Sequence, residues 1–373
     1  MAISSNKIIR ILIVDDSAFM RKAISMMLEE DPQIKIIGTA RNGKEGVDKA
    51  LELKPDLITM DIEMPQMDGL TALKQIMETS PTLVMMLSSL TTDGASATLD
   101  ALELGAVDFI PKQLSFVSLD IVKIKEELLR KIKDIVSRKN VLMAQYRSKK
   151  FTKLKSPEKA ENKFDNKKTA SVSISKSLAT PKRSHSISVI AIGSSTGGPP
   201  ALQAVIPKLP RSLPVGVVIA QHMPPNFTKS MAERLNSLSQ VTVKEAHGGE
   251  EITPGTVFIA PGGQHLTVRK NGNRAYTVVS SSPKDALYKP CVDVMLDSVA
   301  NAYGRFGMGV ILTGMGNNGV VGMRNLKSKG GIVIAQNEET CIVYGMPRAV
   351  IEAKIANHIS PIDNISNEII SYF

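Results

Sequence analysis

The sequence of 373 residues contains two cysteines, Cys291 and Cys341, so at most one disulfide is available and a disulfide framework is excluded. It lacks any apolar run approaching the roughly 20 residues that a membrane-spanning helix requires. It also lacks an N-terminal basic segment followed by an apolar one, the pattern that directs secretion. We therefore expect reduced, partly buried thiols and a protein that acts in the cytoplasm.

Nearly all of the net positive charge lies in one segment of the chain. Residues 147–185 hold twelve Lys or Arg and three acidic residues, a balance of +9 within a total of +10. This segment is polar and has no apolar periodicity, which predicts a flexible linker. The remaining sequence is nearly neutral and shows no helix-turn-helix pattern, so we expect no nucleic-acid partner.

Short strand-like runs alternate with amphipathic helical patterns over residues 7–115. The runs are Ile8–Val14, Ile34–Ala40, Asp56–Met60, Leu83–Leu87 and Val107–Ile110. Five repeats of strand and helix predict a parallel sheet that is covered by helices on both faces.

Charged side chains follow three of these runs. Asp15 and Asp16 come after the first, Asp61 after the third and Lys112 after the fifth. The carboxyl ends of parallel strands meet at one crevice, so these groups are expected to lie together. Carboxylates that share a site favour a bound cation, and Mg²⁺ suits an oxygen-rich site that accepts phosphate oxygens. Asp61 would then serve as a carboxylate nucleophile toward a phosphoryl donor.

The same residues fall within motifs of a known family. Asp-Asp-Ser (15–17), Met-Asp-Ile-Glu-Met-Pro-Gln-Met-Asp-Gly (60–69) and Phe-Ile-Pro-Lys (109–112) resemble the receiver domain of response regulators, over about residues 7–125. The order Pro111–Lys112 departs from the usual Lys-Pro. The resemblance implies phosphorylation of Asp61 and a phosphorylation switch that involves Ser88, Phe109 and Lys112. It also implies Mg²⁺ held by Asp15, Asp16, Asp61 and the backbone of Glu63.

A second α/β pattern begins after the predicted linker. Its strand-like runs are Ile187–Ile192, Val215–Ala220, Thr256–Ile259, Met308–Leu312 and Ile332–Ala335, and Asn271-Gly272 predicts a hairpin. The first run breaks into Gly-Ser-Ser-Thr-Gly-Gly (193–198). Such a turn of small residues can present a nucleophilic serine beside an oxyanion site, or it can cradle a phosphate; the motif alone leaves both open.

Two later strand ends favour the hydrolase interpretation. His222 follows Val215–Ala220, and the segment Leu312–Gly319 follows another strand of the same pattern. A serine nucleophile needs a histidine base, and the histidine needs a third group that fixes its tautomer. The spacing of His222, His247 and His265 is not that of metal ligands, so we expect no metal cofactor in this half.

This half resembles the catalytic domain of the chemotaxis receptor methylesterases, the CheB family. The similar stretches are residues 193–198, Gln-His-Met-Pro (221–224), Phe-Ile-Ala-Pro-Gly-Gly (258–263), Val-Asp-Val-Met (292–295) and Thr-Gly-Met-Gly-Asn-Asn-Gly (313–319). The resemblance implies that Ser195 is the nucleophile, His222 the general base and the Met315 amide an oxyanion donor. It implies hydrolysis of glutamate methyl esters on chemoreceptors, and some relatives also deamidate receptor glutamines.

One position departs from that family. Asn318 stands where the family has the aspartate of its catalytic triad. An amide oxygen accepts a hydrogen bond from histidine but supplies no negative charge, and an Asp-to-Asn change in another serine hydrolase lowers turnover by about 10⁴. We therefore predict a slowed esterase. The alternative is a phosphorylation-dependent scaffold that binds receptors without catalysis. Asp293 is a conceivable substitute acid, although a role in packing or at a helix start is favoured.

The whole sequence thus predicts an α/β protein of three parts. A five-stranded parallel flavodoxin-like receiver domain spans 7–125, a helix end and basic linker spans 126–186, and a doubly wound, mostly parallel esterase domain spans 187–373. The resemblance implies a receiver that covers the esterase cleft until it is phosphorylated. The expected partners are methyl-accepting chemoreceptors, which the protein contacts peripherally at the membrane, and a histidine kinase as phosphodonor. We expect a monomer.

Overall fold

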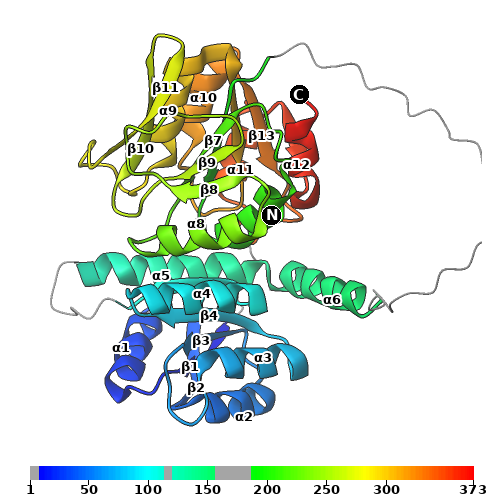
Figure 1. Cartoon of the computed structure of the whole chain (residues 1–373). Helices are drawn as coiled ribbons and strands as arrows, with labels where there is room; N and C mark the ends of the chain where they lie inside the picture. The colour runs from blue at the N-terminus through cyan, green and yellow to red at the C-terminus, as the bar shows by residue number, and fades with distance from the viewer. Residues whose placement is uncertain (1–7, 113–119, 156–185) are drawn as a thin grey trace, which may run out of the picture.

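The computed structural model describes residues 8–112, 120–155 and 186–373, which form two stacked α/β domains (Figure 1). The N-terminal domain has a parallel sheet of five strands in the order β2-β1-β3-β4-β5. The strands are β1 (Ile9–Val14), β2 (Ile34–Ala40), β3 (Leu57–Asp61), β4 (Leu83–Ser88) and β5 (Asp108–Pro111). The helices are α1 (Ala18–Glu29), α2 (Gly43–Leu53), α3 (Gly69–Thr79), α4 (Thr92–Leu104), α5 (Asp120–Ser137) and α6 (Lys139–Lys155). The predicted five-stranded parallel sheet is confirmed.

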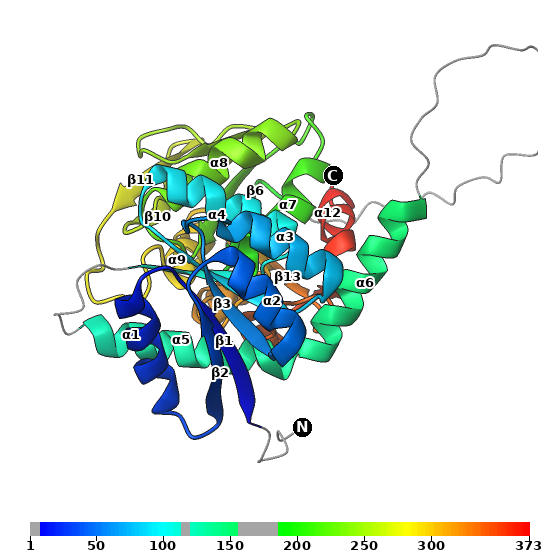
Figure 2. The same cartoon turned by 90° about the horizontal axis from the view of Figure 1, so that it is seen from below.

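Alternation along β1 explains why helices cover both faces of this sheet. Leu12 and Val14 are buried toward α2, α3 and α4, whereas Ile11 and Ile13 are buried toward α1 and α5. Figure 2 shows these two helical layers on either side of the strands. Successive strand residues point to opposite faces, so a strand of continuous aliphatic residues needs cover on both.

Helix α6 differs from the sequence prediction. It continues to Lys155, into the segment from Arg147 that the sequence assigned to the linker. Leu142 is buried in the cluster that contains α5, and the Tyr146 hydroxyl donates to the Met77 carbonyl at 3.2 Å. These contacts hold the first half of the helix, and helical propagation beyond a formed turn costs little. Residues 156–185 of the predicted linker lie outside the described residues.

The C-terminal domain has a parallel sheet in the order β14-β13-β12-β6-β7-β9-β8 and a separate antiparallel hairpin, β10-β11. Its strands are β6 (Val189–Ser194), β7 (Gly216–Gln221), β8 (Thr242–Glu245), β9 (Thr256–Ile259), β10 (His265–Asn271), β11 (Arg274–Ser280), β12 (Gly307–Ile311), β13 (Ile332–Gln336) and β14 (His358–Ser360). The mostly parallel doubly wound sheet and the hairpin at Asn271-Gly272 are confirmed. The two edge strands, β8 and β14, were not predicted because each has a single aliphatic residue and so forms no aliphatic run.

Two helical layers enclose the second sheet. The helical segments are α7 (Gly198–Val205), η1 (Ile206–Lys208), α8 (Phe227–Leu238), α9 (Val292–Tyr303), η2 (Gly304–Phe306), α10 (Val320–Ser328), α11 (Met346–Glu352) and α12 (Ile362–Ile370). Buried side chains of α7, α8 and α12 share one cluster, and those of α9, α10 and α11 share another on the opposite face. No helix in the described ranges has the length and apolarity of a membrane span.

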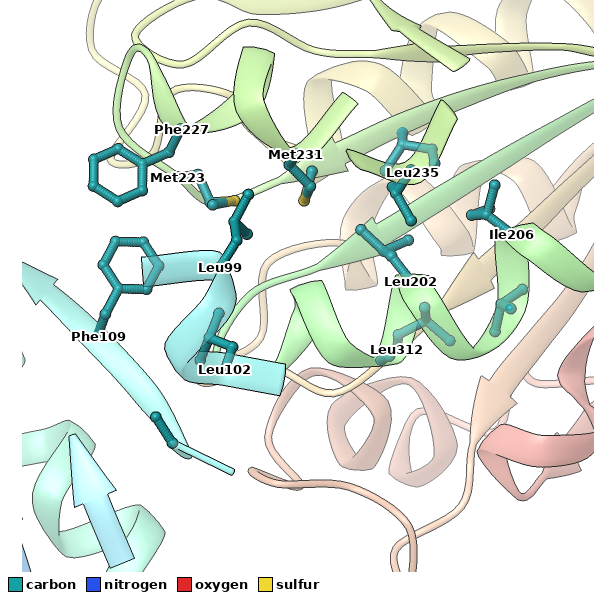
Figure 3. Close-up of a cluster of buried hydrophobic side chains, with 14 of the residues drawn as sticks. Leu99, Leu102, Phe109, Leu202, Ile206, Met223, Phe227, Met231, Leu235 and Leu312 are labelled. Atoms are coloured by element: carbon teal, nitrogen blue, oxygen red, sulfur yellow. The ribbon is translucent and has the colours of Figure 1, made fainter. Parts of the chain in front are cut away.

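Apolar side chains join the two domains without a break. Phe109 of β5 stacks on Phe227 of α8, with ring centroids 4.8 Å apart and planes 4° from parallel. Leu99 of α4 points toward Met223, in the same buried cluster (Figure 3). A stacked aromatic pair contributes about 0.5–1.5 kcal/mol beyond its buried area. The contact between the domains is therefore a packed core in its own right.

Polar contacts flank this apolar centre. The Arg234 guanidinium pairs with Asp100 at 2.6 Å and with Glu103 at 2.5 Å, both on α4. On the other side, Arg138 at the end of α5 pairs with Glu338 at 3.3 Å. These ion pairs are partly exposed, so each stabilises the contact weakly and mainly fixes its orientation.

Gly322 allows α10 to pack closely on α9, and its substitution tests that packing. A Cβ at this position would lie 2.5 Å from the Leu296 Cβ and 2.9 Å from the Asp293 carbonyl oxygen. Alanine gains up to about 1 kcal/mol in helix propensity, but the steric overlap involves backbone and dominates. We expect Gly322→Ala to destabilise the protein by roughly 1–3 kcal/mol. Chemical denaturation measures the change, with the exposed neighbour Val321→Ala as control; equal stability of both variants would contradict the close packing.

Candidate functional site

Three neighbouring strands of the C-terminal sheet end at one place. β12, β6 and β7 are adjacent in the sheet. Ser195 and His222 directly follow β6 and β7, and Asn318 lies in the loop between β12 and α10. The strand order reverses at β6: β7 lies on one side of it, and β12, which comes later in the chain, lies on the other. Such a reversal point creates a crevice at the carboxyl edge of an open α/β sheet.

The backbone around Ser195 forms a sharp turn between β6 and α7. The Ser195 amide donates to the Thr313 carbonyl at 3.1 Å, and the Gly198 amide donates to the Ser195 carbonyl at 2.7 Å. Gln221 braces this turn, because its side-chain amide donates to the Ser195 carbonyl at 2.9 Å. A Cβ at position 198 would lie 1.8 Å from the Gln221 Oε1, so any larger residue there would displace the Gln221 side chain from this position.

A continuous chain of side-chain contacts links the three strand ends. The Ser195 Oγ lies 3.2 Å from the His222 Nδ1, and the His222 Nε2 lies 2.9 Å from the Asn318 Oδ1. An amide oxygen only accepts, so the His222 Nε2 must carry the proton of the neutral ring. The Nδ1 lone pair is then free to accept from the Ser195 hydroxyl.

The Asn318 amide is held at both of its ends. Its Oδ1 also accepts from the Val292 backbone N–H at 2.8 Å, at the start of α9. Its Nδ2 donates to the Asp293 Oδ2 at 2.7 Å and to the Cys291 Sγ at 3.2 Å. A donor at one end and an acceptor at the other together determine which way the amide points.

Burial controls the charge of His222. The pKa of the imidazole falls from 6.5 to about 4, mainly through burial; the bond to Asn318 opposes this change, and the nearby Lys131 charge contributes to it. The ring stacks on Tyr288, with centroids 4.3 Å apart and planes 13° from parallel. His222 is therefore neutral near pH 7, which is the form that accepts a proton.

Backbone N–H groups near Ser195 are available to a developing negative charge. The Thr313 and Gly314 amides donate to the Gln336 Oε1 and the Val343 carbonyl, respectively. The Thr196 and Met315 amides, by contrast, donate to no acceptor among the residues that the structure describes. Met315 itself is buried against α5 and α6 side chains of the N-terminal domain.

A second polar site lies at the carboxyl edge of the N-terminal sheet. Oxygen atoms of Asp15, Asp16 and Asp61 all lie within 4.8 Å of one another, the single such group of potential metal ligands among the described residues. The Lys112 Nζ lies 2.8 Å from Asp15 and 2.6 Å from Asp61. The order Pro111–Lys112 therefore still delivers the lysine to both carboxylates.

The charges in this site are unevenly balanced. The pKa of Asp61 is raised to about 6, mainly by burial; Lys112 opposes this change, and the Asp15 and Asp16 charges contribute to it. Burial opposes the charged form of Lys112, but its bonds to Asp15 and Asp61 outweigh that and raise its pKa. An all-carboxylate donor set with a surplus of negative charge fits a hard divalent cation such as Mg²⁺.

The three other receiver residues predicted from the sequence lie around this site. The Ser88 hydroxyl is buried and donates to the Gly94 carbonyl at 3.0 Å. The exposed Glu63 carboxylate lies 3.5 Å from the Ser89 Oγ. Phe109 faces away from the carboxylates and packs against Phe227. The switch role of these residues stays a prediction.

Sequence reasoning gave too little weight to residues that support His222. Asp293 lies in the first turn of α9 and accepts from the Gly322 N–H of α10, as the favoured packing or helix-start role predicts, and it also accepts from the Asn318 amide. Tyr288 was not singled out, because it lies in an irregular segment that has no motif. Gln221 was visible, since it immediately precedes His222 in the motif at 221–224. His265 has both ring nitrogens within hydrogen-bond distance of backbone groups, at Cys291 and Pro283, and so serves the loop structure.

Comparison with known proteins identifies the family of each domain. The family model for CheB methylesterase matches residues 190–369, and that for the response regulator receiver domain matches residues 11–122. A protein-glutamate methylesterase/protein-glutamine glutaminase of Oleidesulfovibrio alaskensis is 48% identical over 97% of this chain and 99% of its own length. The corresponding Thermotoga maritima protein is 43% identical over 98% of this chain and 99% of its own. The chain, in which a response regulator receiver domain precedes a methylesterase domain, therefore belongs to the CheB methylesterase family.

Proposed function

We propose that the C-terminal domain hydrolyses methyl esters of glutamate side chains on chemoreceptors, with Ser195 as nucleophile and His222 as general base. The observation that carries this is the chain of contacts from the Ser195 Oγ through His222 to the Asn318 Oδ1. The names of the relatives, protein-glutamate methylesterase/protein-glutamine glutaminase, supply the substrate class.

The first half of the reaction forms an acyl-enzyme. The Ser195 Oγ attacks the ester carbonyl carbon while its proton passes to the His222 Nδ1. The carbonyl oxygen becomes an oxyanion, which the Thr196 and Met315 amides stabilise by hydrogen bonds. His222 then returns the proton to the methoxy oxygen, the C–O bond breaks and methanol leaves.

The second half restores the enzyme. Water attacks the acyl carbon as His222 takes one of its protons, and the Ser195 oxygen then leaves with that proton. The product is the glutamic acid side chain, which releases its remaining proton to water and becomes a carboxylate. A glutamine side chain passes through the same steps with ammonia as the leaving group, so one site accounts for both activities in the relatives' names.

The receiver domain supplies control through Asp61. Phosphoryl transfer from a histidine kinase to Asp61 adds about −1.5 to −2 charge at a site that already holds three carboxylates. Asp15, Asp16 and Asp61, with the backbone of Glu63, would hold Mg²⁺, which neutralises phosphoryl oxygens when it is bound. Lys112 lies against Asp61 and pairs with the remaining charge.

The unphosphorylated receiver holds the esterase closed. Met223, which directly follows His222, is buried in one cluster with Leu99 of the receiver, and Met315 is buried against α5 and α6. The segments that carry the base and the oxyanion donor are thus both covered by the same domain. Phosphorylation that shifts Phe109 disturbs its stack on Phe227 and favours an open form.

Replacement of the nucleophile separates the enzyme from the scaffold alternative. We expect Ser195→Ala to abolish methanol release from methylated receptor membranes, because no other hydroxyl lies against the His222 Nδ1 among the described residues. Ser194→Ala is the control, since the Ser194 Oγ bonds Gln221 instead of His222. Unchanged methanol release in Ser195→Ala would reject the mechanism, and a receptor phenotype that survives the loss of release would favour the scaffold.

Reversal of one charge in the domain contact tests closure. Arg234→Glu places a third carboxylate against Asp100 and Glu103. Exposed pairs are worth about 0.2–1 kcal/mol, so we expect basal methanol release to rise roughly threefold to tenfold. Arg348→Glu, which alters a pair within one helix, is the control.

A basal rate of methanol release in Arg234→Glu equal to that of wild type would contradict closure through this contact.

In the same assay, a small-molecule phosphodonor should raise the rate of methanol release by the wild-type protein and leave the rate of Asp61→Asn unchanged.

Opening should also change the pH dependence. The catalytic base must be neutral, so activity is present above the pKa of His222 and is lost as the pH falls through it. In the closed form burial and Lys131 lower that pKa to about 4. Removal of the receiver exposes the ring to water and returns its pKa toward the ordinary value of about 6.5. The acid limb of kcat/KM should therefore lie at higher pH in a chain that lacks residues 1–145 than in the full chain; coincident limbs would show that the receiver does not shield His222.

A further inference from the structure

We propose that Asp293 is a positioning residue for catalysis, which fixes the orientation of the Asn318 amide and through it the tautomer of His222. The inference rests on the proposed function and extends its catalytic chain by one residue. Asp293 would then supply the carboxylate that is missing at position 318, one hydrogen bond further from His222.

The two ends of the Asn318 amide have partners of opposite kinds, with donors at Oδ1 and an acceptor at Nδ2. The Oδ1 end faces two donors, the Val292 N–H at 2.8 Å and the His222 Nε2 at 2.9 Å. The Nδ2 end faces the Asp293 Oδ2 at 2.7 Å, and a carboxylate at neutral pH only accepts. If the amide turned over, its NH₂ would face the Val292 N–H and its oxygen would face the carboxylate. Both contacts would then be repulsive.

The orientation of this amide decides whether Ser195 can be activated. With Oδ1 toward His222, the ring proton stays on Nε2 and Nδ1 accepts from the Ser195 hydroxyl at 3.2 Å. With Nδ2 toward His222, the ring proton would move to Nδ1, where it would oppose the serine proton. In the other serine hydrolase cited above, the wrong tautomer costs about 10⁴ in turnover.

The two carboxylate oxygens of Asp293 have different partners. Its Oδ1 accepts from the Gly322 N–H at 2.9 Å and so joins α9 to α10. Its Oδ2 holds Asn318. The helix-packing contact and the contact to Asn318 are therefore on separate atoms. Asp293→Asn can retain the oxygen that accepts from Gly322 while an NH₂ group replaces the oxygen that accepts from Asn318.

The charge of Asp293 also reaches the active site through this bond. A hydrogen bond to a carboxylate polarises the amide and makes its oxygen a stronger acceptor for the imidazolium that forms during attack. Asn318→Asp alone would place two carboxylates at a contact that is now 2.7 Å. One of them would then have to retain a proton. The exchange Asp293→Asn/Asn318→Asp avoids this change, because it keeps one carboxylate and one amide at the contact.

Asp293→Asn is the first test, in the full-length protein. Its new NH₂ would face the Asn318 NH₂, and the clash is relieved when Asn318 turns over. We expect kcat for methanol release to fall at least about 100-fold, within the limit of about 10⁴ for a wrong tautomer, with KM changed less than about threefold because Asp293 does not contact substrate. ¹⁵N NMR of the His222 ring should show the proton moved from Nε2 to Nδ1.

Asp297→Asn is the matched control. Asp297 lies one turn further along α9 and accepts from the Asn325 Nδ2 of α10 at 2.8 Å, a contact of the same kind that does not reach His222. It should keep both kcat and the His222 tautomer. If Asp293→Asn behaves like Asp297→Asn in both measurements, Asp293 only packs the helices and the inference fails.

The double variant Asp293→Asn/Asn318→Asp guards against a loss that comes from misfolding. In it a carboxylate at 318 accepts from His222, Val292 and the new amide at 293, so every donor again meets an acceptor. We expect kcat to return to within about tenfold of wild type or to exceed it, by the same tautomer argument. A double variant as inactive as Asp293→Asn would overturn the positioning role.

Ser195→Ala, assayed in parallel, keeps the two claims distinguishable. If it retains methanol release, the proposed mechanism itself is wrong. If it is inactive while Asp293→Asn keeps wild-type kcat and tautomer, only the positioning role is rejected.

Discussion

The catalytic arrangement depends on one hydrogen bond, between the His222 Nε2 and the Asn318 Oδ1. It selects the tautomer of the partly buried, neutral imidazole, because the ring nitrogen that meets an acceptor is the one that carries the proton. That bond in turn needs Asn318 to point one way, which the Val292 N–H and the Asp293 carboxylate impose from the first turn of α9. A neutral residue can therefore stand where the family has an aspartate and still leave the serine facing a lone pair.

The same edge of the sheet also faces the receiver domain. Met223 directly follows the proposed base and Met315 carries a proposed oxyanion donor, and each is buried in a cluster that includes side chains of the N-terminal half. Catalytic geometry and domain contact thus share segments of backbone. A change in the contact cannot leave the surroundings of His222 unaltered, and burial is what lowers the pKa of that residue.

The receiver's own site is connected to the contact by β5. This strand carries Phe109, which stacks on Phe227, and the chain directly beyond its last residue, Pro111, carries Lys112, which bonds Asp15 and Asp61. A change of charge at Asp61 acts first on Lys112, three residues from the aromatic ring that touches the esterase. This short connection is the route by which the proposed phosphorylation of Asp61 would alter the packing of Phe109 on Phe227.

The sequence alone determined the two α/β sheets, because aliphatic runs of strand length alternating with helical periods permit few other folds. It also placed Asp15, Asp61, Ser195 and His222 at strand ends, since residues that directly follow parallel strands meet at one edge. Edge strands β8 and β14, the helical part of the predicted linker and the role of Asp293 were decided only by the tertiary structure. Their partners lie far away along the chain: Asp293 meets Asn318 through the packing of α9 on α10, and a single sequence has no periodic signal for a contact between two side chains.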